Sequence, residues 1–319
     1  MIHDVLIVGG GPAGLSAALA LGRARKRVLL CDGGPRRNAR AEHIHNFVTR
    51  DGTPPDEFRA VGRQQLLAYP TVELRDQRVE HIGGTRGAFE VRVGGEALMV
   101  RRVLLCTGMV DLPPAIEGMA ELWGHSVFQC PYCHGFEVRD RRFGYLASDD
   151  PRSVDFALFL RGWTSQVRVF THGRADLEAA RPRLLTGGVE LETRAIRRLV
   201  GTQGQLGQMS QMSQISQISH VELVDGTQIP CDALFTHPAQ RQVEVVASLG
   251  LALDEAGFVK VDAMTRETSI PGIYAGGDLI TRQQGAVFAA AAGVHAATML
   301  NHELTADLLA SGALVWPAP

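Results

Sequence analysis

The chain has 319 residues, of which 45% are hydrophobic and 21% are charged, with a formal net charge of −2. At about 150 residues per domain this length predicts two domains, and the composition excludes disorder of the whole chain. The near-neutral charge provides no basic field for nucleic acid or anionic lipid, so we expect no nucleic-acid partner.

No apolar run approaches the roughly 20 residues that a membrane helix needs, and the N-terminus begins a strand at once instead of a signal segment. We therefore expect a cytoplasmic protein without membrane contact. The five cysteines are an odd number with one close pair, which does not fit a secreted disulfide framework. In a reducing compartment a lone C-x-x-C is a metal half-site or a redox pair.

The first predicted elements are a strand at 5–8, a glycine-rich turn, a helix at 15–22 and a buried strand at 28–31. This order opens a doubly wound parallel sheet. Residues 72–100 alternate between apolar and polar side chains, which predicts an antiparallel meander, and 103–106 return as a buried strand.

Pro113-Pro114 marks the exit from this first domain, because paired prolines cannot continue a helix or a central strand. A second α/β pattern follows, with a strand at 143–147, a helix at 153–160, a strand at 167–170 and a strand pair formed by 189–200 and 221–224. Four Gln-Met/Ile-Ser triplets at 208–219 fit neither the helix nor the strand period, so we expect disorder at a hairpin tip; a role in binding a partner is the alternative.

The second pattern closes near Pro238, and after it residues 258–261, residues 273–274 and an Ala-rich helix at 286–300 supply the missing half of the first domain. The predicted fold is therefore α/β, with two Rossmann-like three-layer domains, the second inserted into the first. The first domain covers 1–114 and 239–319, and the inserted domain covers 115–238.

Gly9-x-Gly11-x-x-Gly14 lies between a predicted strand and a predicted helix, with Pro12 and Ala13 inside the motif. Gly9 permits a tight turn, Gly11 lets backbone amides approach a pyrophosphate, and Gly14 permits close packing of the helix on the strand. Asp32, at the end of the second strand, can accept hydrogen bonds from an unphosphorylated ribose, which favours FAD or NAD. A glycine-rich turn that binds no nucleotide is the alternative.

Two later motifs favour FAD: Thr107-Gly108 after a buried strand, and Gly276-Gly277-Asp278 after residues 273–274. With them the chain resembles, over nearly its whole length, the class II thioredoxin reductases of the FAD-dependent pyridine nucleotide-disulfide oxidoreductase family. The resemblance implies that Asp278 contacts the ribitol and pyrophosphate of FAD, and that the helix start at Gln284-Gly285 faces the isoalloxazine. It also implies a homodimer.

The same resemblance places further residues around FAD. It implies that the loop after Asp32 wraps the cofactor and that the backbone of Val79 contacts the adenine. The loop residues concerned are Arg37, Asn38, His45 and Asn46. Surface or core roles are the alternative for all of these positions.

Cys130-Pro131-Tyr132-Cys133 is the candidate reaction centre. In a redox pair one thiolate attacks a disulfide and its neighbour resolves the mixed disulfide. A zinc site would need two more ligands, and although His125 and His134 are near, no second C-x-x-C is present, so we expect no metal. The same four residues occur in glutaredoxins, which are small single domains; a buried structural pair is the remaining alternative.

By the resemblance, Cys133 would lie against the flavin while Cys130 engages the substrate. His134 stands where thioredoxin reductases usually carry an acid/base aspartate, and an imidazole that titrates near neutrality can move the thiol proton as well. The run from Cys130 to Gly135 resembles the branch that contains gliotoxin- and holomycin-type dithiol oxidases.

The inserted domain departs from the thioredoxin reductase pattern at its nucleotide turn. The turn after 143–147 reads Ser148-Asp149-Asp150-Pro151-Arg152, without glycine and with two carboxylates where a pyrophosphate would arrive. After 167–170, Arg174 stands alone instead of an arginine cluster. We therefore expect NADPH binding to be weakened or lost.

These observations predict an FAD-dependent thiol/disulfide oxidoreductase. Electrons would pass between a dithiol substrate and FAD through Cys130 and Cys133, with O2 or another acceptor reoxidising the flavin. The substrate would be a small-molecule dithiol or a thioredoxin-like protein. The alternatives are an NADPH-dependent disulfide reductase, a ferredoxin-linked reductase and a redox-sensing flavoprotein without turnover.

Overall fold

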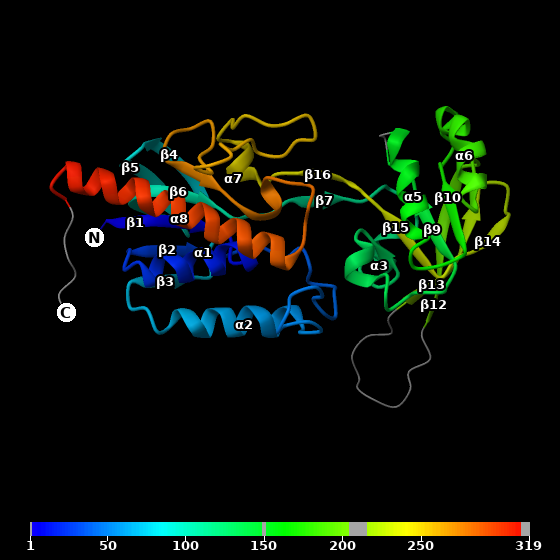
Figure 1. The fold of residues 1–319 in the computed structure, drawn as a ribbon, viewed down its shortest axis with the longest axis horizontal. Coiled ribbons are helices and arrows are strands. Elements are labelled where there is room, and N and C mark those ends of the chain that lie inside the picture. The colour runs from blue at the N-terminus through cyan, green and yellow to red at the C-terminus, as the bar shows by residue number, and fades with distance from the viewer. Residues whose placement is uncertain (1, 149–150, 204–215, 314–319) are drawn as a thin grey trace. The chain divides into compact units, whose positions relative to one another are not determined.

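The computed structural model describes residues 2–148, 151–203 and 216–313. The chain divides into two compact units (Figure 1). Unit 1 comprises Met1–Val110 and Gln240–Pro319, and unit 2 comprises Asp111–Ala239. The short strands β7 (Val110–Leu112) and β16 (Ala239–Arg241), which pair with each other, contain the two points where the chain passes between the units.

Unit 1 is built on a seven-stranded sheet with the order β3-β2-β1-β6-β5-β4, to which β17 adds beside β6. Its strands are β1 (His3–Val8), β2 (Val28–Cys31), β3 (Val72–Arg75), β4 (Val79–Thr85), β5 (Ala88–Val93), β6 (Glu96–Leu105) and β17 (Ile273–Ala275). Its helices are α1 (Pro12–Arg23), α2 (Pro55–Leu66), α7 (Glu244–Ala247) and α8 (Ala286–Ala310).

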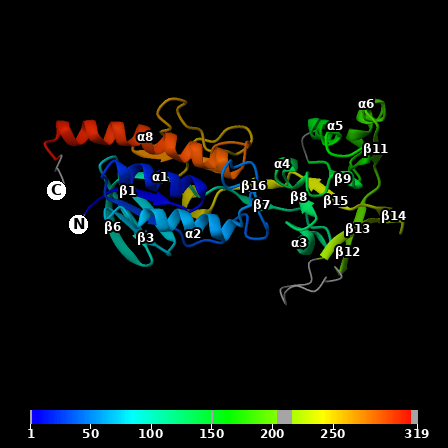
Figure 2. The same cartoon turned by 60° about the horizontal axis from the view of Figure 1, so that its bottom comes forward.

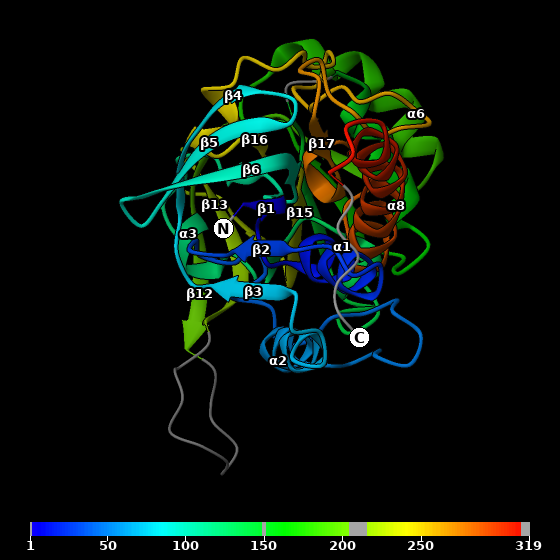
Figure 3. The same cartoon turned by 90° about the vertical axis from the view of Figure 1, so that its left-hand side faces the viewer.

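The central strands of unit 1 are apolar on both faces because both faces are covered. Val5 and Ile7 of β1 pack with α1 and α8, whereas Leu6 and Val8 pack into a second core with β4, β5 and α7. Figure 2 shows α1 and α8 running side by side, and Figure 3 shows both on the same face of the sheet.

Unit 2 contains a five-stranded parallel sheet with the order β11-β10-β9-β15-β8 and an antiparallel three-stranded sheet, β12-β13-β14. The strands are β8 (Val127–Phe128), β9 (Phe143–Leu146), β10 (Val167–Phe170), β11 (Val189–Glu192), β12 (Ile196–Gln203), β13 (Ser216–Leu223), β14 (Gln228–Pro230) and β15 (Ala233–Thr236). The helices are α3 (Met119–Leu122), α4 (Pro131–His134), α5 (Asp155–Leu160) and α6 (Arg181–Thr186).

One core of unit 2 joins the parallel sheet to α5 and α6, and the other joins it to α3 and the antiparallel sheet. The parallel sheet therefore lies between two covering layers, as in unit 1. The predicted α/β class with two Rossmann-like units is confirmed.

Several predicted elements differ from the structure. Residues 72–75 are not part of the meander but form β3, which pairs parallel with β2. Residues 189–200 are two strands in different sheets, because β11 pairs with β10 while β12 pairs with β13. Residues 258–261 belong to unit 1, where Val259 makes an isolated bridge to Leu253 and packs with Phe258 into the core.

The predicted disorder of the triplet repeat is wrong at its C-terminal end. Residues 216–219 belong to β13, and Ile218 is buried in the core that α3 and the antiparallel sheet share. The rest of the repeat, residues 208–215, lies outside the described residues.

Candidate functional site

The predicted nucleotide motifs of unit 1 gather at one edge of its sheet. Strands β1, β2, β6 and β17 are mutually parallel, so their carboxyl ends lie at the same edge. The glycine turn follows β1, Asp32 follows β2, Thr107-Gly108 follows β6 and Gly277-Asp278 comes just after β17. The topology thus brings together segments from both ends of the chain.

The glycine turn allows a close backbone approach. Gly9 has φ +106°, and a Cβ there would lie 2.5 Å from the carbonyl oxygen of Cys106. A Cβ on Gly14 would lie 1.8 Å from the carbonyl oxygen of Gly9, so α1 packs tightly against its own turn. At these two positions only glycine avoids a collision.

The N-terminus of α1 has the character of an anion site. Gly11 is its N-cap, exposed, and a Cβ there would meet nothing within 4 Å. The first turn, which begins with Pro12 and Ala13, carries no acidic residue and no side-chain cap, so its N–H groups are not satisfied by carboxylates. Free N–H groups and the helix dipole favour a phosphate at this position.

Asp32 lies directly beside the glycine turn. A Cβ on Gly10 would lie 2.5 Å from the Oδ2 of Asp32, so Gly10 is required here as well. The Asp32 carboxylate is ion-paired with Arg59 of α2. The sequence predicts neither Gly10 nor Arg59 as a site residue. Gly10 stands at a variable position of the glycine motif, and no local signal distinguishes Arg59 from other basic helix residues.

The second half of the edge packs against the first through small residues. Gly277 has φ +80°, and a Cβ there would lie 2.9 Å from the Cβ of Ala13. A Cβ on Gly293 of α8 would lie 2.1 Å from the carbonyl oxygen of Ala13. Side chains at these positions would push α1 and α8 apart, and Gly293 is a further position that the sequence reasoning missed.

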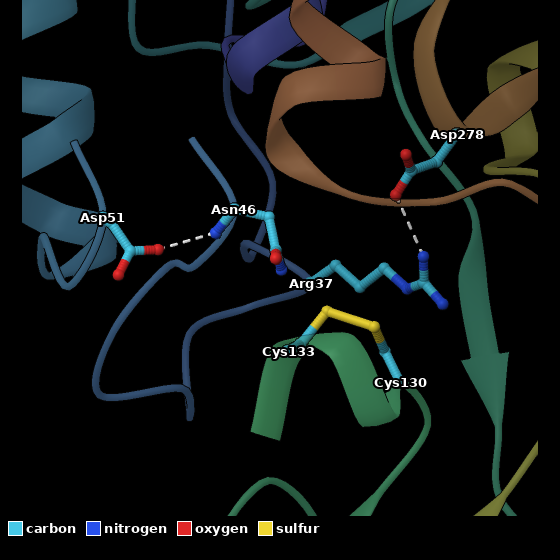
Figure 4. The surroundings of a disulfide bond; sticks show 6 residues. All are labelled: Arg37, Asn46, Asp51, Cys130, Cys133 and Asp278. Atoms are coloured by element: carbon cyan, nitrogen blue, oxygen red, sulfur yellow. Dashed lines mark hydrogen bonds and ion pairs between the residues drawn. A yellow bond between two sulfur atoms is a disulfide. The ribbon is translucent and has the colours of Figure 1, made fainter. Parts of the chain in front are cut away.

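Asp278 forms an ion pair with Arg37 of the loop after β2. Nη1 of Arg37 lies 3.0 Å from Oδ2 of Asp278, and both side chains are about three-quarters buried (Figure 4). A Cβ on Gly108 would lie 4.0 Å from the Asp278 Cβ, so the segment after β6 also lies close to Asp278. Two residues that were predicted to contact the same cofactor are therefore direct partners.

The start of α8 is fixed by a pair of amides. Gln284 Nε2 donates to Gln240 Oε1 at 2.9 Å, and Gln240 Nε2 donates back to Gln284 Oε1 at 3.1 Å. Gln284 Nε2 also lies 3.4 Å from the carbonyl oxygen of Asp278, and Gly285 forms the N-cap of α8. This arrangement connects the Gln284-Gly285 segment to Asp278.

The loop between β2 and α2 carries the other predicted contacts, and Asp51 organises part of it. Asn46 has φ +64°, and its backbone N–H donates to Asp51 Oδ1 at 2.7 Å (Figure 4). His45 Nδ1 lies 3.4 Å from Asp51 Oδ2. The N–H of Asn46, and then His45, hold the pKa of Asp51 below its usual value. Asn38 is exposed in the same loop.

Val79 is buried at the start of β4. Its neighbour Arg78 donates from Nε to the carbonyl oxygen of Gly33 at 3.0 Å, which ties the start of β4 to the residue after Asp32. Val79 therefore lies near the predicted ribose-binding carboxylate.

The residues of this edge fit FAD. A glycine with open space stands at a helix N-terminus that has no competing carboxylate, and a carboxylate lies at the end of the adjoining strand. These features match a pyrophosphate and an unphosphorylated ribose.

In unit 2, Cys130 and Cys133 form a disulfide with their Cα atoms 5.3 Å apart (Figure 4). Cys130 is the N-cap of the one-turn helix α4, so the turn itself brings the two sulfurs together. Both cysteines are partly exposed. His134 follows Cys133 directly in the chain. Its ring stacks on Phe128 with the ring centroids 4.4 Å apart, which restricts the orientation of the imidazole.

The other three cysteines are inert by contrast. Cys31, Cys106 and Cys231 are buried and free, and burial raises the pKa of each thiol to about 12. A thiol with such a pKa is a poor nucleophile at neutral pH. Within the described ranges, no group of three or more His, Cys, Asp or Glu side chains is placed to hold a metal ion.

The turn after β9 in unit 2 contrasts with the glycine turn of unit 1. The Ser148 N–H donates to Ser153 Oγ at 3.2 Å, and Arg174 donates to the Ser148 carbonyl and, at 2.7 Å, to Asp176. Helix α5, which follows a 3-10 turn, has six residues against twelve in α1. Asp149 and Asp150, predicted to oppose a pyrophosphate, lie outside the described residues.

Comparisons with known proteins agree with this arrangement. Residues 3–296 match the pyridine nucleotide-disulphide oxidoreductase family. Thioredoxin reductase sirT of Leptosphaeria maculans is 34% identical over 339 residues, covering 98% of each protein.

Two solved structures are similar over nearly their full length. HlmI has a TM-score of 0.85 and 34% identity, covering 97% of this chain and 95% of that one. An oxidoreductase from Agrobacterium tumefaciens has a TM-score of 0.83 and 35% identity, covering 96% and 99%.

No helix in the part of the chain that the structure describes is both long and apolar enough to span a membrane. The family match and the full-length relatives confirm the resemblance drawn from the glycine, Gly-Gly-Asp and C-P-Y-C motifs. The chain accordingly belongs to the pyridine nucleotide-disulphide oxidoreductase family and is a thioredoxin reductase-like, FAD-dependent disulfide oxidoreductase.

Proposed function

We propose that this enzyme oxidises a small-molecule dithiol through the Cys130–Cys133 disulfide, with O2 as the final electron acceptor. The observation that carries the proposal is the contrast between the two units. Unit 1 has an open glycine turn at the start of a twelve-residue helix. In unit 2 the corresponding turn has Ser148 bonded to Ser153 and to Arg174, which follows β10, and it leads into a six-residue helix. This supports one nucleotide cofactor, FAD, rather than FAD and NADPH together.

We assign unit 1 to the FAD-binding domain, which the sequence predicts at 1–114 and 239–319, and unit 2 to the inserted domain, which it predicts at 115–238; the units themselves divide after Val110 and after Ala239. The FAD contacts assigned in unit 1 are Gly9, Gly11, Pro12, Ala13, Gly14, Asp32, Arg37, Asn38, His45, Asn46, Val79, Thr107, Gly108, Gly277, Asp278, Gln284 and Gly285. The glycine turn, Asp32, Thr107-Gly108 and Gly277-Asp278 follow strands whose carboxyl ends lie at the same edge of the sheet, which supports this assignment.

The thiol chemistry takes place on this chain's own sulfurs. A substrate thiolate attacks Cys130 Sγ, the Cys130–Cys133 bond breaks, and Cys133 leaves as a thiolate. The second substrate thiol then attacks the mixed disulfide, which releases the substrate as an intramolecular disulfide and leaves both cysteines reduced. When bound, FAD would supply the acceptor for the two electrons released as the Cys130–Cys133 disulfide forms again, with O2 as their final acceptor.

His134 is the residue assigned to proton transfer. It directly follows Cys133, and stacking on Phe128 restricts its ring. An imidazole in this place can take the proton of the attacking thiol and return it to a leaving thiolate.

We infer from the single C-x-x-C pair and the three free cysteines that the protein works in a reducing, cytoplasmic compartment. A homodimer is proposed from the family alone. The alternative function, suggested by the relatives named thioredoxin reductase, is the reduction of a thioredoxin-like protein by NADPH.

Oxygen uptake distinguishes the two functions. With a dithiol such as dithiothreitol as the only reductant, the proposal predicts catalytic O2 consumption with one O2 taken up per disulfide formed, and H2O2 as product. Turnover with NADPH and oxidised thioredoxin, without O2 uptake on dithiol, would overturn it.

A further inference from the structure

Arg59 is positioned to control the carboxylate that meets the ribose. It projects from α2 and ion-pairs with Oδ2 of Asp32, the residue at the carboxyl end of β2. Gly62, three positions further along α2, would have a Cβ 2.9 Å from Leu15 Cδ1, so a glycine there lets α2 approach α1 closely. This close approach brings Arg59 within reach of Asp32.

The ion pair commits only one oxygen of Asp32. Oδ2 is held by Arg59 and lies against the backbone of Gly10. In the described residues Oδ1 has no hydrogen-bond partner, and it is not among the buried unpaired atoms. One carboxylate oxygen is therefore fixed, and the other remains available to a ribose hydroxyl.

Arg59 is bound to Asp32 more firmly than to any other described acid. Its second carboxylate, Asp76, lies 3.8 Å away and is already held by Arg63 through two hydrogen bonds of 2.8 and 3.0 Å. The Arg59 Nε is buried and donates to no described group. A guanidinium in such surroundings depends on Asp32 for its charge compensation.

The charge also matters for the neighbouring anion. Asp32 stands beside the N-terminal turn of α1, where the pyrophosphate of FAD belongs, and two like charges in one pocket oppose each other. The positive charge of Arg59 offsets the negative charge of the Asp32 carboxylate, and the carboxylate can still accept hydrogen bonds.

We propose that Arg59 is a positioning residue for FAD: it fixes Oδ2 of Asp32 and offsets its charge, so that Oδ1 can accept the ribose hydroxyls of the adenosine half. This inference rests on the assignment of unit 1 as the FAD site. It does not depend on which substrate the enzyme oxidises or on the final acceptor.

The test measures the FAD dissociation constant from the fluorescence of flavin released when holoenzyme is diluted. Arg59→Met should raise this constant about tenfold, the scale expected for one charge-assisted hydrogen bond. Arg59→Lys, which keeps the charge but not the planar fork, should give an intermediate value. Arg63→Met is the matched control, since Arg63 lies one turn further along α2 with similar exposure but holds Asp76; it should change the constant less than twofold.

The decisive comparison uses Asp32→Asn. If Arg59 acts through Asp32, Arg59→Met should have no further effect on FAD affinity in the Asp32→Asn background. An equal loss in both backgrounds, an equal loss in Arg63→Met, or tighter FAD binding by Arg59→Met would overturn the proposal. Failure of the proposed oxidase function would appear as absent dithiol turnover in the unmodified enzyme, a result that leaves the measured FAD dissociation constants unaffected.

Discussion

Arg37 and Asp278 are 241 positions apart in the chain, yet their side chains form an ion pair with Nη1 and Oδ2 3.0 Å apart. The pair joins the loop after β2 to the segment after β17, and so connects the two chain segments of unit 1 where the predicted FAD contacts gather.

Replacing Arg37 by Met should weaken FAD binding. The change removes the Arg37 ion pair from Asp278, a largely buried carboxylate that is predicted to contact FAD, so we expect the FAD dissociation constant to rise about tenfold. Flavin fluorescence on dilution measures it. Arg36→Met is the matched control, because Arg36 pairs with Asp56 instead; equal effects of the two variants would argue against a role for the Arg37–Asp278 pair.

Cys133→Ser should abolish steady-state dithiol oxidation while the protein still binds FAD. Without the second sulfur the disulfide cannot form, so we expect at least a thousandfold loss of kcat, the scale found when a covalent catalytic group is removed. Cys231→Ser serves as the control, because serine can keep the hydrogen bond that Cys231 Sγ donates to the Ala233 carbonyl. Retained turnover in Cys133→Ser would leave only a flavin-based function, such as redox sensing.

Alkylation should distinguish the two classes of cysteine. After mild reduction, iodoacetamide at pH 8 should modify Cys130 and Cys133. For the buried thiols, whose pKa is raised to about 12, only about one molecule in ten thousand is a thiolate at that pH. Peptide mass spectrometry before and after denaturation provides the measurement, and rapid native labelling of Cys106 would contradict the account.

The same pKa shift has a consequence for stability. The unfolded chain ionises these thiols near the ordinary value of 9.0, whereas the folded chain keeps them neutral until about 12. The contribution of these neutral thiols to the free energy of unfolding is therefore fully present below pH 9, and it is lost as the pH rises toward 12.

His134 should act as an acid/base group that aspartate can replace and leucine cannot. His134→Leu should lower kcat/KM by about a hundredfold or more, the usual scale for general acid–base catalysis. His134→Asp should retain most of the activity. It should also move the acidic limb of the profile of kcat/KM against pH to lower pH, because a carboxylate remains available as a base at a lower pH than an imidazole does. Equal activity of all three proteins, with an unchanged profile, would remove His134 from the mechanism.

The sequence revealed the parts of unit 1 whose signals are local. The turn Gly9-x-Gly11-x-x-Gly14 between an apolar strand and a helix is one continuous pattern, and it forms the tight turn that was expected. Strand β3 was misplaced because its side chains are only partly buried at the sheet edge, so its pattern resembles a meander strand.

Residues that act through distant partners could not be found in this way. Arg59 matters because α2 brings it to Asp32, and Gly293 because α8 crosses α1 at Ala13; both relationships exist only once the chain has folded. Asp51 was missed for a similar reason, since its role is to accept the N–H of Asn46, whose φ is positive.

Anaerobic reduction of the bound flavin tests the central claim most directly. The purified yellow protein is titrated in parallel with dithiothreitol, NADPH and NADH while the visible absorbance of the flavin is followed. We predict that dithiothreitol bleaches the flavin through Cys130 and Cys133, and that stoichiometric NADPH or NADH does not. Rapid bleaching by stoichiometric NADPH, followed by turnover with thioredoxin, would contradict the account and identify the enzyme as a pyridine-nucleotide-dependent reductase.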